Sequence, residues 1–367
     1  MKILTVGGGP AGLYFAYLAK RRHPDWDIRV VEQTRADSTF GFGVVFSDKA
    51  LEFLRGDDSD TYDAITAHME QWVDLTVVHR DTAVVIDGIG FAAIGRLKFL
   101  QLMQQRLAST RVVPQYGSAL QDKSELDGYD LVVAADGANS FVRRTRDFGT
   151  TITPLTNKFA WFGTRKAFRT LTQTFVENED GTFNAHHYRH APDMSTFVLE
   201  CDAATWQRAG FAHMDEEDTL RYAERVFART LEGETLVSNK SVWRNFPNIR
   251  NRLWHVGNTV LIGDALRTAH FSIGSGTRLA MEDAIALARA LDEHASIPDA
   301  LAAFEAARRP IVEKLVAAAD ASGAWYERFP QHMKLAPRDF AWSYIQRSGR
   351  VDPERLRKTS PRFVDGT

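Results

Sequence analysis

The apolar positions of this chain form two kinds of pattern, which together predict an α/β fold. Some runs are almost wholly apolar, as in strands that are buried on both faces of a parallel sheet: residues 2–6, 130–135 and 259–262. Other stretches carry apolar residues at helical spacing: residues 10–22, 97–107, 279–291 and 298–319, the last interrupted near Pro310. Strand followed by helix at the N-terminus indicates a Rossmann-like parallel sheet.

From about residue 150 the pattern changes to short strands joined by turns such as Glu179-Asp180-Gly181, which predicts an antiparallel sheet. The expected strands cover residues 159–166, 172–177, 183–189 and 195–200, and a helix follows over 216–231. Elsewhere, strands are expected at 26–32, 75–78 and 111–116. We therefore expect a discontinuous dinucleotide-binding domain (1–150 and 250–347), an inserted sheet-based substrate domain (151–249) and a loose tail (348–367).

The turn after the first predicted strand has the sequence G-G-G-P-A-G at residues 7–12. In the pattern G-x-G-x-x-G, Gly7 makes a tight turn, Gly9 allows the backbone to approach a pyrophosphate, and Gly12 allows the helix to pack closely on the strand. Pro10 and Ala11 open the helix, so its free N–H groups and positive dipole end face the phosphates. This turn predicts a dinucleotide site.

A carboxylate ends the second predicted strand. Glu32 lies twenty residues after Gly12 (32 − 12), and Gln33 follows it. An acid at this distance hydrogen-bonds the ribose of an unphosphorylated adenosine. The cofactor is therefore expected to be FAD or NAD, and this motif alone does not separate the two.

Two further segments are candidates for cofactor contact. Residues 34–48 carry Gly41 and Gly43 in F-G-F-G-V-V-F-S, which fits either a loop across a flat ligand or a tight bend in a buried strand. Arg96 lies in the first turn of the helix that Gly95 introduces. A cation there opposes the helix dipole unless something negative lies nearby, so Arg96 is a candidate phosphate or flavin contact.

Composition narrows the function further. The 367 residues are 44% hydrophobic with a net charge of −2, so no basic stripe indicates binding to nucleic acid or an anionic membrane. The single cysteine, Cys201, excludes a disulfide framework and a thiolate metal cluster. A strand that begins at residue 2 argues against a secretory signal, and no apolar run is long enough to span a membrane. We expect a cytoplasmic protein without a metal.

Three separated segments together resemble the single-component FAD-dependent aromatic hydroxylases of the p-hydroxybenzoate hydroxylase type. They are G-G-G-P-A-G at 7–12, D-G-A-N-S-F-V-R at 136–143, and Gly263-Asp264 leading to G-S-G-T at 274–277. Shorter strings are similar to salicylyl-CoA 5-hydroxylase, 2-aminobenzoyl-CoA monooxygenase and the tryptophan-derivative hydroxylase of the violacein pathway: W-F-G-T at 161–164, A-H-H-Y-R at 185–189, M-S-T-F-V-L-E at 194–200 and A-H-F-S-I-G-S-G-T at 269–277.

The resemblance implies a role for each matching position. Gly7, Gly9, Gly12 and Glu32 would hold the ADP half of FAD, and Asp136 would lie on the pyrophosphate side, along the path of NADH or NADPH. Asp264 would accept a hydrogen bond from the ribityl or pyrophosphate-linked hydroxyls. Gly274, Gly276 and Thr277 would begin a helix whose N–H groups face the flavin pyrimidine.

The implied reaction is the hydroxylation of an aromatic ring by O2 through a flavin C4a-hydroperoxide, after reduction of FAD by NADH or NADPH. The chain departs from the family where relatives carry Gly-Asp-Ala-Ala-His and then prolines: here Leu266-Arg267 and His270 stand instead. His270 is a candidate donor or base, or it simply packs. His186 or His187 could also act as the base if the pKa of its imidazole lies near 7. Because adjacent strand residues point to opposite faces, only one of the two can line the pocket.

The substrate is less constrained. An aryl-CoA thioester such as salicylyl-CoA would explain the basic residues of the middle third, because CoA phosphates need cationic anchors: Arg165, Lys166, Arg169, Arg189, Arg244, Arg250 and Arg252. An indole- or tryptophan-derived substrate is the alternative. A flavin halogenase lacks support because no W-x-W-x-I-P segment occurs. An isoprenoid reductase is less favoured, because the strings of the middle domain resemble those of hydroxylases. A non-enzymatic dinucleotide-binding regulator remains an alternative.

Overall fold

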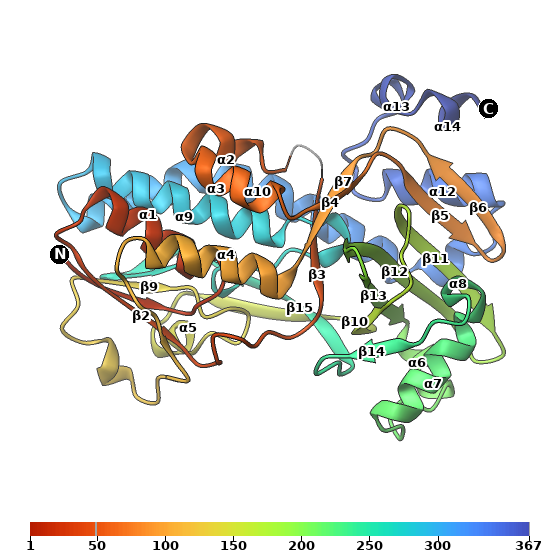
Figure 1. Ribbon diagram of the computed structural model, residues 1–367, viewed down its shortest axis with the longest axis horizontal. Helices are drawn as coiled ribbons and strands as arrows, with labels where there is room; N and C mark the ends of the chain where they lie inside the picture. The colour runs from red at the N-terminus through yellow and green to blue at the C-terminus, as the bar shows by residue number, and fades with distance from the viewer. Residues whose placement is uncertain (48–49, 367) are drawn as a thin grey trace.

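The computed structural model describes residues 1–47 and 50–366, which form two lobes, each built on a large sheet (Figure 1). The first lobe contains a six-stranded sheet in the order β16-β17-β9-β1-β2-β8. Its strands pair in parallel from β17 to β8, and β16 is antiparallel. They are β1 (Lys2–Val6), β2 (Asp27–Glu32), β8 (Gln115–Tyr116), β9 (Leu131–Ala134), β16 (His255–Val256) and β17 (Thr259–Leu261).

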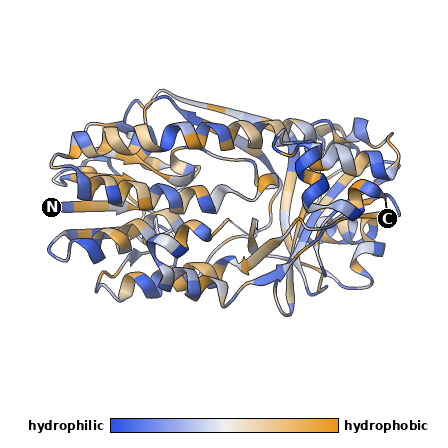
Figure 2. Cartoon of the chain, turned by 90° about the horizontal axis from the view of Figure 1, so that it is seen from above, coloured by the Kyte–Doolittle hydropathy of each residue, from blue (hydrophilic) through white to orange (hydrophobic). Residues whose placement is uncertain are grey.

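Helices α1, α4, α9 and α10 pack side by side over this sheet (Figure 1). Figure 2 shows hydrophobic and hydrophilic residues alternating along the helices, while the N-terminal strand is mostly hydrophobic. Side chains such as Leu13 and Phe15 of α1 are completely buried against the strands, and each stabilises the fold by about 1.5–3 kcal/mol. The helices of this lobe are α1 (Pro10–Arg22), α2 (Glu52–Asp57), α3 (Ser59–Thr66), α4 (Arg96–Ala108), η1 (Lys123–Leu126), α5 (Phe141–Thr145), η2 (Gly263–Ala265), η3 (Phe271–Ile273), α9 (Gly276–Glu293) and α10 (Ile297–Tyr326).

The second lobe contains an eight-stranded sheet that includes β14-β10-β13-β12-β11-β5-β6, with β15 paired to β10. Only β11 and β5 pair in parallel; the other neighbours are antiparallel. The strands are β5 (Leu75–His79), β6 (Thr82–Ile86), β10 (Thr150–Thr164), β11 (Leu171–Asn178), β12 (Gly181–Ala191), β13 (Met194–Cys201), β14 (Leu236–Ser238) and β15 (Arg244–Asn251). A three-stranded sheet of β3 (Gly43–Ser47), β7 (Phe91–Gly95) and β4 (Glu70–Trp72) lies between the lobes (Figure 1).

The two faces of the eight-stranded sheet are covered differently. One face, which we call the outer face, packs its apolar residues against the segment that forms α6 (Ala203–Arg208), α7 (Glu216–Val226) and α8 (Ala228–Leu231). The other, which we call the inner face, carries Phe159, Gln173, Phe175, His186 and Glu200 in cross-strand register. The end of α10 covers it, together with α11 (Phe329–His332) and α12 (Pro337–Gln346).

Several sequence expectations need correction. The strand expected at 111–116 is reduced to Gln115–Tyr116, and α10 runs through Pro310 without interruption because Pro310 is exposed, so the carbonyl that loses its partner can face water. The segment expected at 216–231 divides into α7 and α8.

The domain boundaries also differ from those expected. Strands β5 and β6 come from the first 150 residues, yet they complete the eight-stranded sheet. The tail expected to be loose forms α13 (Pro353–Thr359) and α14 (Pro361–Asp365), which bury Leu356 and Phe363. The segment 34–48, expected to be either a loop across a flat ligand or a bend in a buried strand, contains β3. Its last residue, like residue 367, lies outside the described residues.

Candidate active site

The three glycine-containing segments meet at one edge of the six-stranded sheet. The segments after β1, β9 and β17 all leave the carboxyl ends of parallel neighbours, the position where open α/β sheets bind ligands. Gly274 lies against β3, because a Cβ added there would sit 3.3 Å from the carbonyl oxygen of Val45. The residues that were predicted from separate motifs are therefore brought together.

Glycine is needed at the three positions of the first turn for different physical reasons. A Cβ on Gly7, whose φ is +109°, would lie 2.2 Å from the carbonyl oxygen of Ala135, and a Cβ on Gly12 would lie 2.0 Å from the carbonyl oxygen of Gly7. A Cβ on Gly9 would meet no atom within 4 Å. Gly7 and Gly12 thus serve packing, whereas Gly9 leaves the first turn of α1 open to a ligand.

Two long helices begin at this edge without a side-chain cap. Gly9 precedes α1 and Ser275 precedes α9, and neither helix has a side-chain hydrogen bond to its first N–H groups. Pro10 and Ala11 lie in the first turn of α1, and Gly276 and Thr277 begin α9. Uncapped N–H groups at two helix N-termini fit a ligand with pyrophosphate and pyrimidine oxygens.

Glu32 is held toward the same turn. Its carboxylate accepts hydrogen bonds from the N–H of Gly8 at 2.6 Å and of Thr34 at 2.7 Å. The nearby Tyr116 hydroxyl is buried and has no partner among residues 1–47 and 50–366. Gln33 is exposed. Sequence reasoning missed Tyr116, although its place at the end of the adjacent strand β8 was a usable signal.

Asp136 and Asp264 follow β9 and β17. One Asp136 oxygen accepts from the N–H of Val142 at 3.1 Å, and the other is buried without a partner in the described structure. Asp264 is exposed to solvent, yet the surrounding protein raises its pKa by desolvation, opposed by the charges of Arg267 and Arg96. Both carboxylates are acceptors that fit a hydroxyl-rich ligand at this edge of the sheet.

Arg96 is the first residue of α4 and lies close enough to Asp264 for the two charges to interact. Its Nε donates to Thr39 Oγ1 at 2.9 Å, and its guanidinium lies 4.8 Å from the centroid of the Phe40 ring. It forms no ion pair with any residue that the structure describes, and burial lowers its pKa even though the charge of Asp264 raises it. A cation held at a helix N-terminus without an acidic partner in the described structure fits contact with a negative ligand group.

The departure at Leu266-Arg267 has a structural explanation. Arg267 donates to Asp283 at 2.6 Å and to the carbonyl oxygen of Gly263 at 2.9 Å. Asp283 also accepts from the Gly263 N–H at 3.1 Å and pairs with Arg308 at 3.3 Å. All three side chains are at least nine-tenths buried, so a buried ion-pair network fixes the turn that carries Asp264.

The candidate histidines separate onto opposite faces, as predicted for adjacent strand residues. His187 lies on the outer face, where it stacks on Phe197 and shares a hydrogen bond with Thr174 at 2.9 Å. His186 lies on the inner face, and its Nε2 is buried without a partner in the described chain. His186 is therefore the one of the two that lies on the face covered by the end of α10.

His270 also faces the inner side, where its Nδ1 is 2.7 Å from Ser272 Oγ. Burial lowers the pKa of His186 and of His270 to about 3, with a further contribution from Arg347. The expectation of a histidine base required a pKa near 7, and neither residue meets it. Both are neutral hydrogen-bonding groups at physiological pH.

Tyr188 is a further residue that sequence reasoning missed. It lies two positions from His186 on the same face, and its hydroxyl donates to the carbonyl oxygen of Gly43 at 2.9 Å. This bond joins the eight-stranded sheet to the glycine segment beside Arg96. The A-H-H-Y-R string contained the signal, because strand alternation places Tyr188 with His186.

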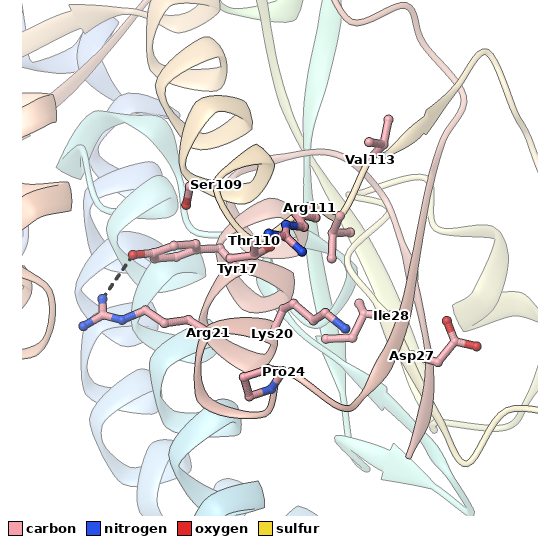
Figure 3. Close-up of a pocket in the computed structure, with 11 residues that line it drawn as sticks. Tyr17, Lys20, Arg21, Pro24, Asp27, Ile28, Ser109, Thr110, Arg111 and Val113 are labelled. Carbon is pink, nitrogen blue, oxygen red and sulfur yellow. Dashed lines mark hydrogen bonds between the residues drawn. The ribbon is translucent and has the colours of Figure 1, made fainter.

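A hollow of about 720 Å3 lies elsewhere in the described structure. Figure 3 shows it lined by Tyr17, Lys20 and Arg21 of α1 and by residues after α4. It opens at the start of β2, which is the opposite end of the sheet from the glycine turn. We place the active site at the carboxyl edge because the uncapped helices and unpartnered polar groups gather there.

The sequence predicts neither a metal site nor a membrane-spanning segment. Among residues 1–47 and 50–366, no group of three or more His, Cys, Asp or Glu side chains is arranged to hold a metal ion. No helix in the same ranges combines the length and the apolar character that a membrane crossing requires.

The fold and the edge geometry define a flavin-type dinucleotide-binding protein with an inserted sheet. The model of the FAD binding domain family matches residues 109–319. The chain belongs to this family, within its FAD-dependent aromatic hydroxylases. It is thus an FAD-dependent aromatic monooxygenase that uses NADH or NADPH, as the sequence predicted.

Three relatives support this assignment. The chain is 42% identical to salicyloyl-CoA 5-hydroxylase of a Streptomyces species, covering 95% of this chain and 70% of the relative. It is 40% identical to 3-hydroxy-4-methyl-anthranilyl-[aryl-carrier protein] 5-monooxygenase of Streptosporangium sibiricum, covering 90% of each. It is 33% identical to protodeoxyviolaceinate monooxygenase of Chromobacterium violaceum, covering 96% of each.

The predicted fold class is confirmed by a solved structure. The tetrameric form of 2-methyl-3-hydroxypyridine-5-carboxylic acid oxygenase superposes with a TM-score of 0.70, covering 98% of this chain and 95% of that one. The two sequences are only 18% identical, so this likeness concerns the fold alone.

Proposed function

We propose that this monooxygenase hydroxylates an aromatic ring that is carried as a CoA thioester, with salicylyl-CoA, attacked at position 5, as the leading substrate. The observation that supports this most is the 42% identity to a salicyloyl-CoA 5-hydroxylase over 95% of the chain. The carrier-linked anthranilyl substrate in the name of a second relative points to the same kind of thioester.

The same proposal assigns the cofactor contacts. FAD, once reduced by NADH or NADPH, supplies the electron transfer and oxygen activation that protein side chains lack. The backbone donors of α1 and α9 would bind its phosphates and pyrimidine, and the acids would bind its hydroxyls. The residues proposed to hold it are Gly7, Gly9, Pro10, Ala11, Gly12, Glu32, Gln33, Arg96, Asp136, Asp264, Gly274, Gly276 and Thr277.

His270 and His186 are proposed to contact the substrate ring. Because both stay neutral, they would orient the ring by hydrogen bonds and would not carry charge. The apolar side chains of Phe246 and Phe271, whose rings lie 5.0 and 4.3 Å from the His270 ring, help to exclude water.

The basic residues of the middle third divide into two groups. Lys166, Arg189 and Arg250 form ion pairs with carboxylates. The other four are exposed and have no carboxylate partner among the described residues: Arg165, Arg169, Arg244 and Arg252. Arg244 lies 5.6 Å from the Phe40 ring, beside Arg96 and the glycine segment, so we propose it as an anchor for CoA phosphates.

The first experiment compares substrates. The purified holoenzyme should consume NADH or NADPH faster with salicylyl-CoA than with free salicylate, measured by absorbance at 340 nm. Equal rates would remove the thioester proposal. A second candidate is an indole-derived substrate, which the 33% identity to protodeoxyviolaceinate monooxygenase favours, and stimulation by indoles alone would support it.

The second experiment uses two arginines at opposite ends of β15. Replacing Arg244 by Ser should raise KM for salicylyl-CoA by roughly threefold or more, because an exposed contact to phosphate is worth about 1 kcal/mol. The KM for salicylate should not change. Arg252→Ser is the matched control and should affect neither substrate.

A further inference from the structure

Tyr326, at the last turn of α10, joins four elements on the inner side of the eight-stranded sheet. Its hydroxyl donates to Gln173 Oε1 at 2.9 Å, and its ring lies 5.7 Å from that of His270. The guanidinium carbon of Arg347, just after α12, lies 5.9 Å from the ring centroid. Residues from β11, α10, α12 and the segment before η3 therefore converge here.

Among the residues that the structure describes, backbone oxygens hold Arg347 and no acid pairs with it. It donates to the carbonyl oxygens of Tyr344 and Ser272, each at 2.8 Å, and its guanidinium lies 3.8 Å from the Tyr344 ring centroid. Its Nε is buried and finds no acceptor in residues 1–47 and 50–366. A guanidinium in this position without a counter-charge is costly unless a ligand supplies one.

Two more nitrogen atoms nearby lack acceptors. Gln173 and His186 are direct cross-strand neighbours on the inner face, and they are 0% and 5% exposed. The Nε2 atoms of both are buried and unpartnered in the part of the chain that the structure describes. The Gln173 amide is oriented by Tyr326, whose hydroxyl occupies its oxygen, so its NH2 group is left to donate.

The charge around these donors is positive. Burial, and then the charge of Arg347, keeps the pKa of His186 and His270 at about 3, so both histidines are neutral. Glu200 also lies on the inner face, and burial raises its pKa to about 8, which keeps it protonated at pH 7. The charge of Arg347 acts on both histidines.

We propose that Arg347, together with Gln173 and His186, binds an anionic oxygen on the substrate ring, namely the phenolate of a hydroxylated aryl thioester. This inference rests on the proposed function. Three donors from separate elements and one positive charge match an oxygen that carries a negative charge and accepts several hydrogen bonds. A phenolate donates electron density to the carbon para to it, which in a salicylyl ring is position 5.

The test compares ligands with and without the hydroxyl group. The FAD-loaded enzyme is titrated with salicylyl-CoA and with benzoyl-CoA, and the change in flavin absorbance gives each Kd. The wild type should prefer salicylyl-CoA, and Arg347→Met should reduce this preference by about tenfold or more, through weaker salicylyl-CoA binding alone. The phenolate absorbance band of bound salicylyl-CoA should also be lost. Arg350→Met, an exposed arginine three positions on, is the matched control.

A second variant guards against misfolding, because Arg347 also ties α12 to Ser272. Gln173→Met removes one donor from β11 without changing the charge and should reduce the same preference by a smaller factor. FAD content and Tm are recorded for each variant. An unchanged preference in both variants, with FAD bound, would overturn the proposal.

A failure of the proposed CoA substrate can be distinguished from a failure of the phenolate site. If neither thioester perturbs the flavin of the wild type, the CoA substrate is wrong, and the preference is then measured with salicylate against benzoate. Loss of that preference in Arg347→Met still supports the phenolate site, whereas an unchanged preference removes it.

Discussion

The carboxyl edge of the six-stranded sheet and the inner face of the eight-stranded sheet offer different kinds of chemical group to a ligand. At the edge, the ligand-facing groups are backbone N–H groups and open glycines such as Gly9 and Gly276. On the inner face they are buried side chains without partners, such as Gln173 and His186. The edge is specified by short motifs, each of which can be recognised locally in the chain, whereas the inner face is specified by single residues that only the fold brings together.

This difference affects how mutations act. A backbone site fails when a side chain is added, because the new Cβ takes space that a neighbouring backbone or the ligand occupies. A side-chain site fails when a polar group is removed or when its charge state changes. The predictions below test whether the two regions respond separately.

The largest effect is expected at Gly12. In Gly12→Ala the new Cβ would lie 2.0 Å from the carbonyl oxygen of Gly7, so α1 must move away from β1, and we expect loss of FAD and a Tm lower by several degrees. Gly9→Ala meets no atom within 4 Å, so its apoprotein should keep the wild-type Tm and bind FAD weakly. Tight FAD binding by Gly9→Ala would show that the cofactor does not approach this turn.

The next effect concerns the ion-pair network below Asp264. Asp283→Asn leaves Arg267 and Arg308 without their shared carboxylate, and breaking such a buried pair should lower the free energy of unfolding by about 3–5 kcal/mol. Asp292→Asn, on the same helix α9, removes partly exposed pairs to Arg22 and His23 and should cost less than about 1 kcal/mol. Urea unfolding of the two variants measures the contrast, and equal losses would contradict it.

The same contrast explains how far the sequence could predict the molecule. The glycine turn, Glu32 and buried strands such as β1, β9 and β17 were predictable because their signals are local and periodic. The ion-pair partner of Arg267 and the position of Arg347 were not, since residues 267 and 283 meet only after α9 packs, and Arg347 reaches the site through the C-terminal helices. Strands β5 and β6 were also assigned to the wrong lobe, because apolar periodicity does not state which sheet a strand joins.

On the inner face, a pH-dependent effect is expected at Glu200. Its usual pKa of 4.5 is raised to about 8 by burial, so the folded protein keeps a proton that the unfolded chain releases between these values. Stability is therefore lost as the pH rises from 4.5 to 8, by at most about 1.4 kcal/mol per pH unit. Glu200→Gln should leave stability near pH 5 unchanged and increase it at pH 8.

Thermal unfolding at the two pH values checks this expectation. Glu216→Gln, an exposed glutamate on α7, is the control and should shift Tm little at either pH. A Glu200→Gln variant that is less stable at pH 8 than the wild type would mean that the carboxylate is ionised and favourably bound in the folded protein.

The smallest effect should separate the two faces of a single strand. His187 lies on the outer face in an apolar cluster with Phe168 and Phe197, and its polar contact in the described structure is the hydrogen bond to Thr174. His187→Phe should therefore change the free energy of unfolding by about 1 kcal/mol or less and leave kcat and KM unchanged. The neighbouring His186→Phe removes an inner-face nitrogen and should raise KM for the aromatic substrate with little change in Tm. Steady-state kinetics that changed equally in both variants would contradict the assignment of function to the inner face, because strand alternation allows only one of these side chains to lie on that face.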